Sequence, residues 1–208
     1  RDGLESRGLG DVYQRQILAI WVFVSIAYPV FNMELQMSPT QVAIILMALR
    51  LWDGIADPVM GWISDNARTR WGRRRPFIFV GAILAAITYP LIWWFPMDLT
   101  HNQVMLWVIG FGILFYTCFT IWAVPFQSLL MEMTPDYNER TRVTSVRGIF
   151  QSLAGLFNGF CWWISLLPVF SMANEAGELI PSTINGMRYV SIFIAFAILI
   201  LGVLPALF

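Results

Sequence analysis

Long apolar runs separated by short polar segments are the main pattern along the chain. Because about 20 apolar residues cross the hydrocarbon core of a bilayer as an α-helix, each run predicts one membrane span. The six predicted spans cover residues 14–33, 40–64, 76–96, 104–131, 143–169 and 186–208. Pro125 is expected to kink the fourth span or to end its regular part. The pattern predicts an all-α membrane protein, a bundle of six transmembrane helices with short loops and no soluble domain.

The composition agrees with a membrane protein and excludes several other classes. Of 208 residues, 58% are hydrophobic and 12% are charged, against about 25% charged in an average soluble domain. Arginines and acids balance to zero net charge, so nucleic acid is not an expected partner. Cys118 and Cys161 lie in apolar runs, and His101 stands alone, which predicts no disulfide framework and no metal site. We find no nucleophile and base pairing and no phosphate-binding glycine loop, so we expect no enzyme.

The placement of arginines predicts the orientation. Arginines are concentrated in the loops at 65–76 and 132–142, whereas the other loops carry acids. Since positive residues in short loops stay in the cytoplasm, we expect a multi-pass protein of the plasma membrane, in bacteria the inner membrane, with both ends of this segment cytoplasmic. Five tryptophans should then mark the outer interface: Trp93, Trp94, Trp107, Trp162 and Trp163.

The second span carries three ionisable residues on one face. On a helix Arg50, Asp53 and Asp57 fall within about 60° of one another, near the middle of the membrane. A carboxylate there costs at least about 2.5 kcal/mol and must face protein or a water-filled cavity. The two carboxylates, one turn apart, could close on a small cation. Alternatively Arg50 neutralises Asp53 as a structural pair, which leaves Asp57 uncompensated unless Arg147 or a cation reaches it.

Two long segments carry a resemblance to a known family. Residues 50–78, "RLWDGIADPVMGWISDNARTRWGRRRPFI", and 124–148, "VPFQSLLMEMTPDYNERTRVTSVRG", resemble the glycoside-pentoside-hexuronide:cation symporters, the melibiose-carrier group of the major facilitator superfamily. The resemblance spans nearly the whole chain. It implies a carrier of two six-helix bundles with the solute between them. We interpret this chain, which lacks an initial Met, as the amino-terminal half, with the carboxy-terminal bundle absent.

The resemblance also implies roles for individual residues. Asp53, Asp57 and Thr120 match the positions that bind Na⁺, Li⁺ or a proton, and Arg147 matches an arginine that holds the sugar. Two departures from the family pattern leave the substrate class open. Where family members bring an acid or amide of the first helix to the sugar, this chain has Gln16 or Ile17, and no acid is available there. Ala123 stands where many members have Asp or Asn. The candidate solute-binding residues are Arg147, Gln16, Gln127, Trp122 and Arg50. For Trp122, packing is the commoner role of a large residue at helical spacing.

A third set of residues matches the superfamily signature after the second span. Glycine permits close helix approach, and Asp65 can pair with an arginine or cap a helix end at a cytoplasmic gate. The alternative is that the arginines only set the topology. The candidate gate residues are Gly61, Asp65, Arg70, Gly72, Arg73, Arg74, Arg75, Glu139 and Arg140.

These observations predict a symporter that couples a Na⁺, Li⁺ or H⁺ gradient to the transport of a sugar or glycoside by alternating access. Its expected partners are the solute, the lipid bilayer and the other bundle, and no cofactor beyond the coupling cation is expected. Two alternatives stay open: a carrier of a non-sugar solute such as an amphiphilic lipid, and a membrane scaffold or sensor that does not transport.

Overall fold

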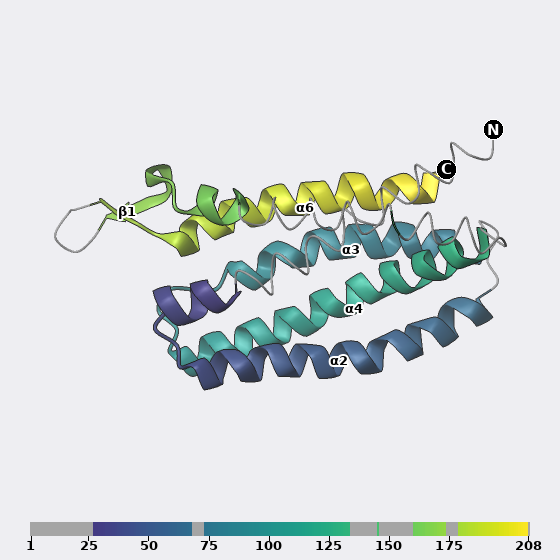
Figure 1. Cartoon of the computed structure of the whole chain (residues 1–208), viewed down its shortest axis with the longest axis horizontal. Helices are drawn as coiled ribbons and strands as arrows, with labels where there is room; N and C mark the ends of the chain where they lie inside the picture. Colours follow the sequence, from purple (N-terminus) through teal and green to yellow (C-terminus); the bar gives the residue numbers. More distant parts are fainter. Residues whose placement is uncertain (1–26, 68–72, 134–144, 146–159, 174–178, 208) are drawn as a thin grey trace.

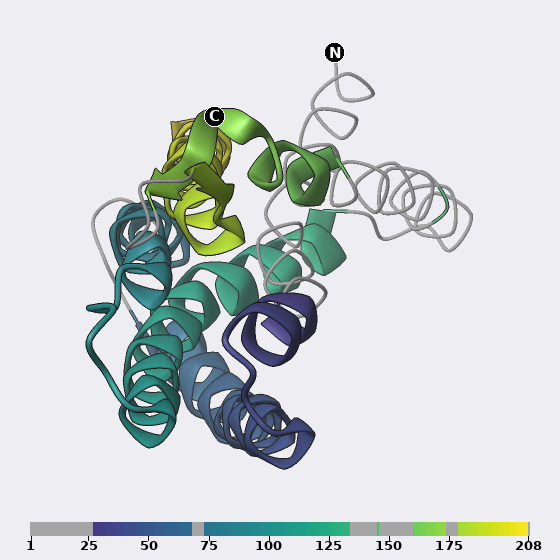
Figure 2. The same ribbon diagram turned by 90° about the vertical axis from the view of Figure 1, so that its left-hand side faces the viewer.

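Long helices make up most of the structure. The computed structural model describes residues 27–67, 73–133, 145, 160–173 and 179–207. Its elements are the π-helix η1 (Pro29–Glu34), α2 (Pro39–Asn66), α3 (Arg75–Trp93), α4 (His101–Met133), the 3₁₀-helix η2 (Pro168–Phe170), β1 (Ser171–Ala173), β2 (Leu179–Pro181) and α6 (Thr183–Leu207). Figure 1 shows the long helices side by side in the order α6, α3, α4, α2. In the end-on view of Figure 2, α3 again lies between α6 and α4.

The helix boundaries agree closely with four of the predicted spans. Spans 40–64, 76–96, 104–131 and 186–208 correspond to α2, α3, α4 and α6. Pro125 does not end α4, which continues to Met133. The span predicted at 14–33 lies mainly outside the described residues, and its last part forms η1 rather than an α-helix. Most of the span predicted at 143–169 also lies outside them.

Fewer helices qualify as membrane spans than the six that the sequence predicted. Within the described residues, three helical segments are long and apolar enough to cross a membrane: Arg75–Trp93, His101–Ser128 and Thr183–Ile200. The chain is therefore a helical membrane protein, but the count of six is not confirmed. Helix α2 is not among the three. Arg50, Asp53 and Asp57 lower its mean hydropathy, although its 28 residues are long enough to span.

The start of α2 is fixed by its own sequence. The hydroxyl of Ser38 accepts a hydrogen bond from the Gln41 backbone N–H, and the Gln41 side chain accepts one from the Ser38 N–H. This capping box satisfies two of the helix's first amides. Gln41 Nε2 also donates to Asn102 Oδ1 at 2.9 Å, so the same residue ties the start of α2 to the start of α4.

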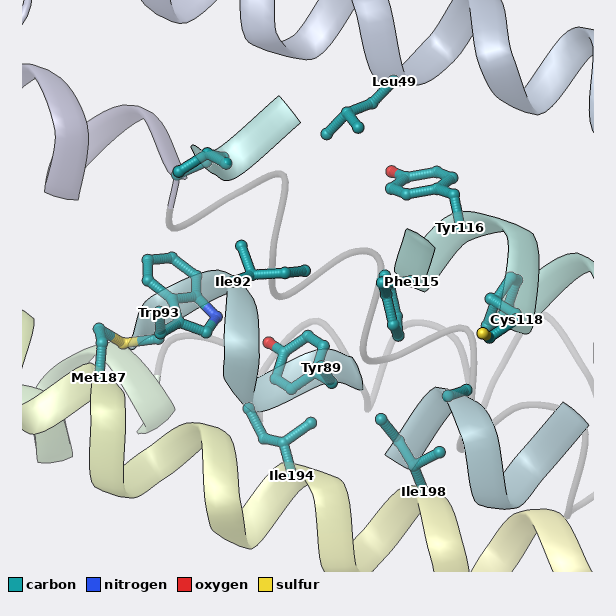
Figure 3. Close-up of a cluster of buried hydrophobic side chains, with 14 of the residues drawn as sticks. Leu49, Tyr89, Ile92, Trp93, Phe115, Tyr116, Cys118, Met187, Ile194 and Ile198 are labelled. Carbon is teal, nitrogen blue, oxygen red and sulfur yellow. The ribbon is translucent and has the colours of Figure 1, made fainter. Parts of the chain in front are cut away.

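The core is centred on α3, which is buried between α4 and α6. A Cβ placed on Gly81 would lie 2.6 Å from the backbone nitrogen of Trp122, so α3 and α4 approach with their backbones nearly in contact. Further along α3, Tyr89 packs edge-on against Phe115 of α4 with ring centroids 5.2 Å apart. Figure 3 shows Ile194 of α6 pointing toward Tyr89. Small residues therefore allow close contact at one end of α3, and aromatic rings fill the space at the other.

Polar side chains cap two helix ends at the end of the bundle where α3 finishes and α6 begins. Arg188 of α6 donates to the carbonyl oxygen of Trp93 at 3.3 Å and to that of Phe95. Glu34 Oε1 accepts from the backbone N–H of Ile184 at 3.3 Å. The last carbonyls and first amides of helices lack intrahelical partners, so both contacts stabilise α3 and α6. We call this end of the bundle the Arg188 end.

Two features of the Arg188 end differ from the sequence-based expectations. Trp93 does not face the membrane interface as predicted, because it is fully buried and stacks on Phe31 with ring centroids 5.7 Å apart. Trp94 and Trp163 are more than half exposed, as interfacial residues would be. The antiparallel ribbon of β1 and β2, which pairs Met172 with Ile180, was not predicted. It extends beyond the helix ends in Figure 1.

Candidate functional site

Arg50, Asp53 and Asp57 form what we call the charged face of α2. Arg50 Nη1 lies 3.7 Å from Asp53 Oδ2, which is an ion pair but is too long for a hydrogen bond. The Asp53 side chain is 25% exposed, whereas Asp57 is exposed and makes no ion pair with another described residue. Asp53 also lies within electrostatic range of Asp57. Arg50 therefore compensates the charge of Asp53 in part, and within the described residues the charge of Asp57 is not compensated by an ion pair.

Helix α4 lies beside α2 and runs parallel to it (Figure 1). A Cβ on Gly112 would meet Leu49 Cδ2 at 2.7 Å, and one on Gly61 would meet Val124 Cγ1 at 3.8 Å. Between these two points, Trp52 Nε1 donates to Thr117 Oγ1 at 2.9 Å. Leu49 and Gly61 are twelve residues apart on α2, and their partners Gly112 and Val124 are twelve residues apart on α4. Residues the same number of positions after Leu49 and after Gly112 therefore lie at about the same depth.

Thr120 follows from this register as the residue level with Asp57. Asp57 comes eight residues after Leu49, and Thr120 comes eight residues after Gly112. Thr120 is 2% exposed, and its Oγ1 has no hydrogen-bond partner in the described part of the chain. Buried hydroxyls are nearly always satisfied, and among the described residues the Tyr89 hydroxyl is the other buried one without a partner. Asp53, Asp57 and Thr120 thus offer oxygen atoms at neighbouring levels of α2 and α4, and oxygen is the donor that hard cations prefer.

The residues expected to bind the solute are distributed over different environments. Gln127 of α4 is exposed, and Arg50 is more than half exposed. Trp122 is fully buried, stacks on Phe126 at 5.2 Å and donates from Nε1 to the carbonyl of Gly202 in α6 at 3.3 Å. This environment supports the packing role for Trp122. Gln16 and Arg147 lie outside the described residues.

The expected gate residues lie at the opposite end of the bundle from Arg188. Arg74 Nη2 donates to Asp65 Oδ1 at 2.9 Å, joining the end of α2 to the start of α3. Arg74 is buried, while Asp65 is exposed. The pairing expected for Asp65 is thus present. Arg73, just before α3, and Arg75, the first residue of α3, are exposed. Arg70, Gly72, Glu139 and Arg140 lie outside the described residues.

Gly61 does not have the tight environment that its place in the signature suggested. The nearest atom to a Cβ there would be Val124 Cγ1 at 3.8 Å, an ordinary van der Waals distance. In this conformation alanine fits at Gly61. Close backbone approaches occur instead at Gly81 in α3 and at Gly186 in α6, neither of which was predicted from the sequence.

Two polar contacts between helices were not predicted from the sequence. The Trp52 to Thr117 hydrogen bond joins α2 to α4 next to Asp53. Arg188 binds backbone carbonyls at the end of α3. A signal existed for Arg188, because an arginine inside an apolar span needs a polar partner. For Trp52 the only signal was its position beside the charged face.

Comparisons with known proteins agree on a class of membrane carriers. A model of the family described as MFS/sugar transport protein matches residues 14–208. The chain is 39% identical over 113 residues to the sodium-dependent lysophosphatidylcholine symporter 1 of Gallus gallus, covering 54% of this chain and 21% of the relative. An uncharacterized symporter of Synechocystis sp. is 37% identical over 111 residues, 51% of this chain and 20% of the relative.

A third relative has a different named solute. The glucuronide carrier protein homolog of Escherichia coli is 28% identical over 149 residues, covering 70% of this chain and 31% of the relative. The matched part of the chain thus covers between 20% and 31% of the length of these three relatives.

Proposed function

The chain belongs to the MFS/sugar transport protein family, and from this premise we propose that it is part of a secondary active transporter, a cation-coupled symporter. The observation that carries the proposal is the oxygen donors of α2 and α4. Within the described residues, Asp53 of the two carboxylates is paired, Asp57 is not, and the buried Thr120 hydroxyl at the level of Asp57 has no hydrogen-bond partner. A charge that is expensive in a membrane and incompletely compensated is typical of an ion pathway.

The proposed cation ligands are Asp53, Asp57 and Thr120. The bound ion is Na⁺, Li⁺ or a proton. Repulsion between the two carboxylates favours binding of one positive charge between them. The sodium-dependent symporter of Gallus gallus supports cation coupling.

In the proposed mechanism, cation binding lowers the negative charge of the charged face and favours solute binding. The bundle then rocks against its partner bundle about a site near the midplane, which exposes the site to the other side. The Asp65 and Arg74 pair is the proposed gate, together with Arg70, Arg73, Arg75, Glu139 and Arg140. Making and breaking such charged contacts biases which side is open.

A sugar or glycoside is the first proposed solute class. The family description and the glucuronide carrier relative support it. Sugar hydroxyls need both donors and acceptors, which Arg147, Gln16, Gln127 and Arg50 provide. Trp122 is the weakest of the candidates, because its indole N–H is already bonded to Gly202.

An amphiphilic lipid is the second proposed class. The lysophosphatidylcholine symporters support it. The relative of Gallus gallus is 39% identical in its matched region, and the glucuronide carrier is 28% identical in its own. Ala123 supports it as well, because it places a methyl group on α4 where many members of the family have Asp or Asn.

We further propose that the Asp65 and Arg74 end of the bundle is cytoplasmic and that the Arg188 end faces outward, in a plasma or inner membrane. Arg73, Arg74 and Arg75 support this orientation, because they lie together at the start of α3. Arg188 does not oppose it, since its guanidinium group bonds to carbonyls of the protein.

Uptake by the full-length protein in proteoliposomes tests the proposal. A radiolabelled glucuronide and lysophosphatidylcholine are each offered under an inward Na⁺ gradient, an inward H⁺ gradient and no gradient. We compare the wild type with Asp57→Asn, and with Asp98→Asn as a matched control, because Asp98 is an exposed acid in the loop between α3 and α4.

The expected result is gradient-driven accumulation of one solute by the wild type and by Asp98→Asn. Asp57→Asn should lose accumulation above the external concentration, because a ligand charge of the cation is gone. The solute that accumulates identifies the substrate class. Equal uptake with and without gradients, unchanged by Asp57→Asn, would show facilitated diffusion, and no uptake of either solute would favour the scaffold alternative.

A further inference from the structure

Two linked hydrogen bonds join α2 to α4 immediately before Asp53. Trp52 Nε1 donates to Thr117 Oγ1 at 2.9 Å, and Thr117 Oγ1 donates to the carbonyl oxygen of Ile113 at 2.8 Å. A threonine hydroxyl has one proton, and here the backbone carbonyl takes it. Its lone pairs therefore face Trp52, whose indole N–H is a donor only. The indole N–H and the hydroxyl O–H therefore each have an acceptor.

This bond is directional, whereas the other contacts beside the charged face are not. Leu49 against Gly112 and Gly61 against Val124 are apolar contacts that permit some rotation of α2. On the charged side, a Cβ on Gly54 would meet nothing within 4 Å in the described structure, so packing there does not fix the helix. Gln41 with Asn102 and Asp65 with Arg74 hold the two ends of α2, and beside the charged face the directional restraint on its rotation is the Trp52 indole.

Rotation of α2 would move its carboxylates directly. Asp53 is the next residue after Trp52, about 100° around the helix, and Asp57 lies one turn further. Turning α2 about its axis so that Asp53 and Asp57 move away from α4 would break the 2.9 Å bond. Away from water, an unpaired indole N–H and hydroxyl oxygen are both unfavourable, so the bond opposes the rotation.

We propose that Trp52 and Thr117 are positioning residues that hold Asp53 and Asp57 in the orientation required for cation binding. They do not touch the ion. They set its affinity by fixing the rotation of α2 on α4. This inference rests on the proposed cation site.

The test is calorimetric titration of the full-length protein in detergent with NaCl and with LiCl, at constant ionic strength kept with choline chloride. The variants are Trp52→Phe, which keeps a ring and removes the N–H, and Thr117→Val, which keeps the shape and removes the hydroxyl. Thr117→Ser restores the acceptor. Trp107→Phe is the matched control, because the Trp107 indole also donates a hydrogen bond, to the Leu91 carbonyl at 3.1 Å, away from the charged face. Thermal unfolding is measured for every variant.

We expect Trp52→Phe and Thr117→Val each to weaken cation binding about fivefold, the factor that corresponds to a hydrogen bond of about 1 kcal/mol. The double variant should be no weaker than either single one, because both remove the same bond. Thr117→Ser should bind like the wild type. Trp107→Phe should lower the melting temperature as much as Trp52→Phe and leave cation affinity unchanged.

The failures of the two proposals differ. If the wild type binds the cation and Trp52→Phe and Thr117→Val reduce only thermal stability, the positioning role is wrong and the cation site stands. Additive losses in the double variant would also contradict it. If the wild type binds neither Na⁺ nor Li⁺, the proposed alkali-cation site is wrong, and the positioning role is wrong with it.

Discussion

Helices α2 and α3 both pack against α4, yet they differ in almost every property that matters for stability and function. Helix α3 is buried between α4 and α6, and Gly81 brings its backbone against that of Trp122. Helix α2 contacts mainly α4 and exposes apolar residues such as Leu51, Ile55 and Val59 along one side. Its charged residues lie at the border of the exposed side. Helix α3 is therefore the one enclosed by its neighbours, and α2 is the one that carries the proposed cation ligands.

The difference follows from what each helix must do in a bilayer. Lipid tails are as apolar as leucine, so helices associate there through close packing of small residues, as at Gly81. A helix that holds ionised groups cannot be enclosed in the same way, because carboxylates need water, a counter-charge or an ion. The following substitutions test this division, beginning with the largest expected effect.

Replacing Gly81 by valine should destabilise the protein most. Its Cβ would lie 2.6 Å from the Trp122 backbone nitrogen, and a backbone atom cannot yield as a side chain does. We expect a loss of about 3 kcal/mol in the free energy of unfolding in micelles. Gly110→Val is the control, because nothing lies within 4 Å of a Cβ there. Equal losses at the two positions would contradict a tight α3 and α4 contact.

Replacing arginine by methionine should be more harmful in α6 than in α2. Arg188 bonds to the Trp93 and Phe95 carbonyls at the end of α3, so Arg188→Met should cost about 2 kcal/mol of stability. Arg50 makes only a 3.7 Å ion pair and is more than half exposed, so Arg50→Met should cost less than about 1 kcal/mol. Denaturant titration of the two variants measures the difference. The reverse order would mean that α2 also contributes to the stabilising core.

Replacing Gly61 by alanine should have the smallest effect. The added methyl group meets Val124 at 3.8 Å, and alanine favours helix more than glycine does. We expect thermal stability to be unchanged or to rise by up to about 1 kcal/mol. A clear loss of stability would show that α2 and α4 approach more closely at Gly61 than this conformation has them.

Particular residues show where sequence reasoning succeeded. The bounds of α2, α3, α4 and α6 were predicted closely, because a long apolar run has few alternatives to a helix in a bilayer. The pairing of Asp65 with an arginine was also expected, since a short loop between two helices keeps them near each other.

Other residues show where it failed. Trp93 was expected at the interface because tryptophans commonly lie there, but its position on α3 directs it into the core against Phe31. Gly61 was chosen from a signature and Gly81 was overlooked, because the need for a small residue depends on which helix crosses that point. The bond from Trp52 to Thr117 joins residues 65 positions apart, which no local pattern encodes.

The sequence by itself determined that this chain is a helical membrane protein of a transporter family, because length, hydropathy and motif residues are properties of single segments. It also determined that Asp53 and Asp57 share a face of one helix, since helical periodicity alone fixes that. Only the tertiary structure decided that Thr120 lies level with Asp57, that Arg188 caps α3 and that Trp122 is packed rather than open. Each of these depends on the register between helices distant in sequence, and that register is set by the packing of all of them together.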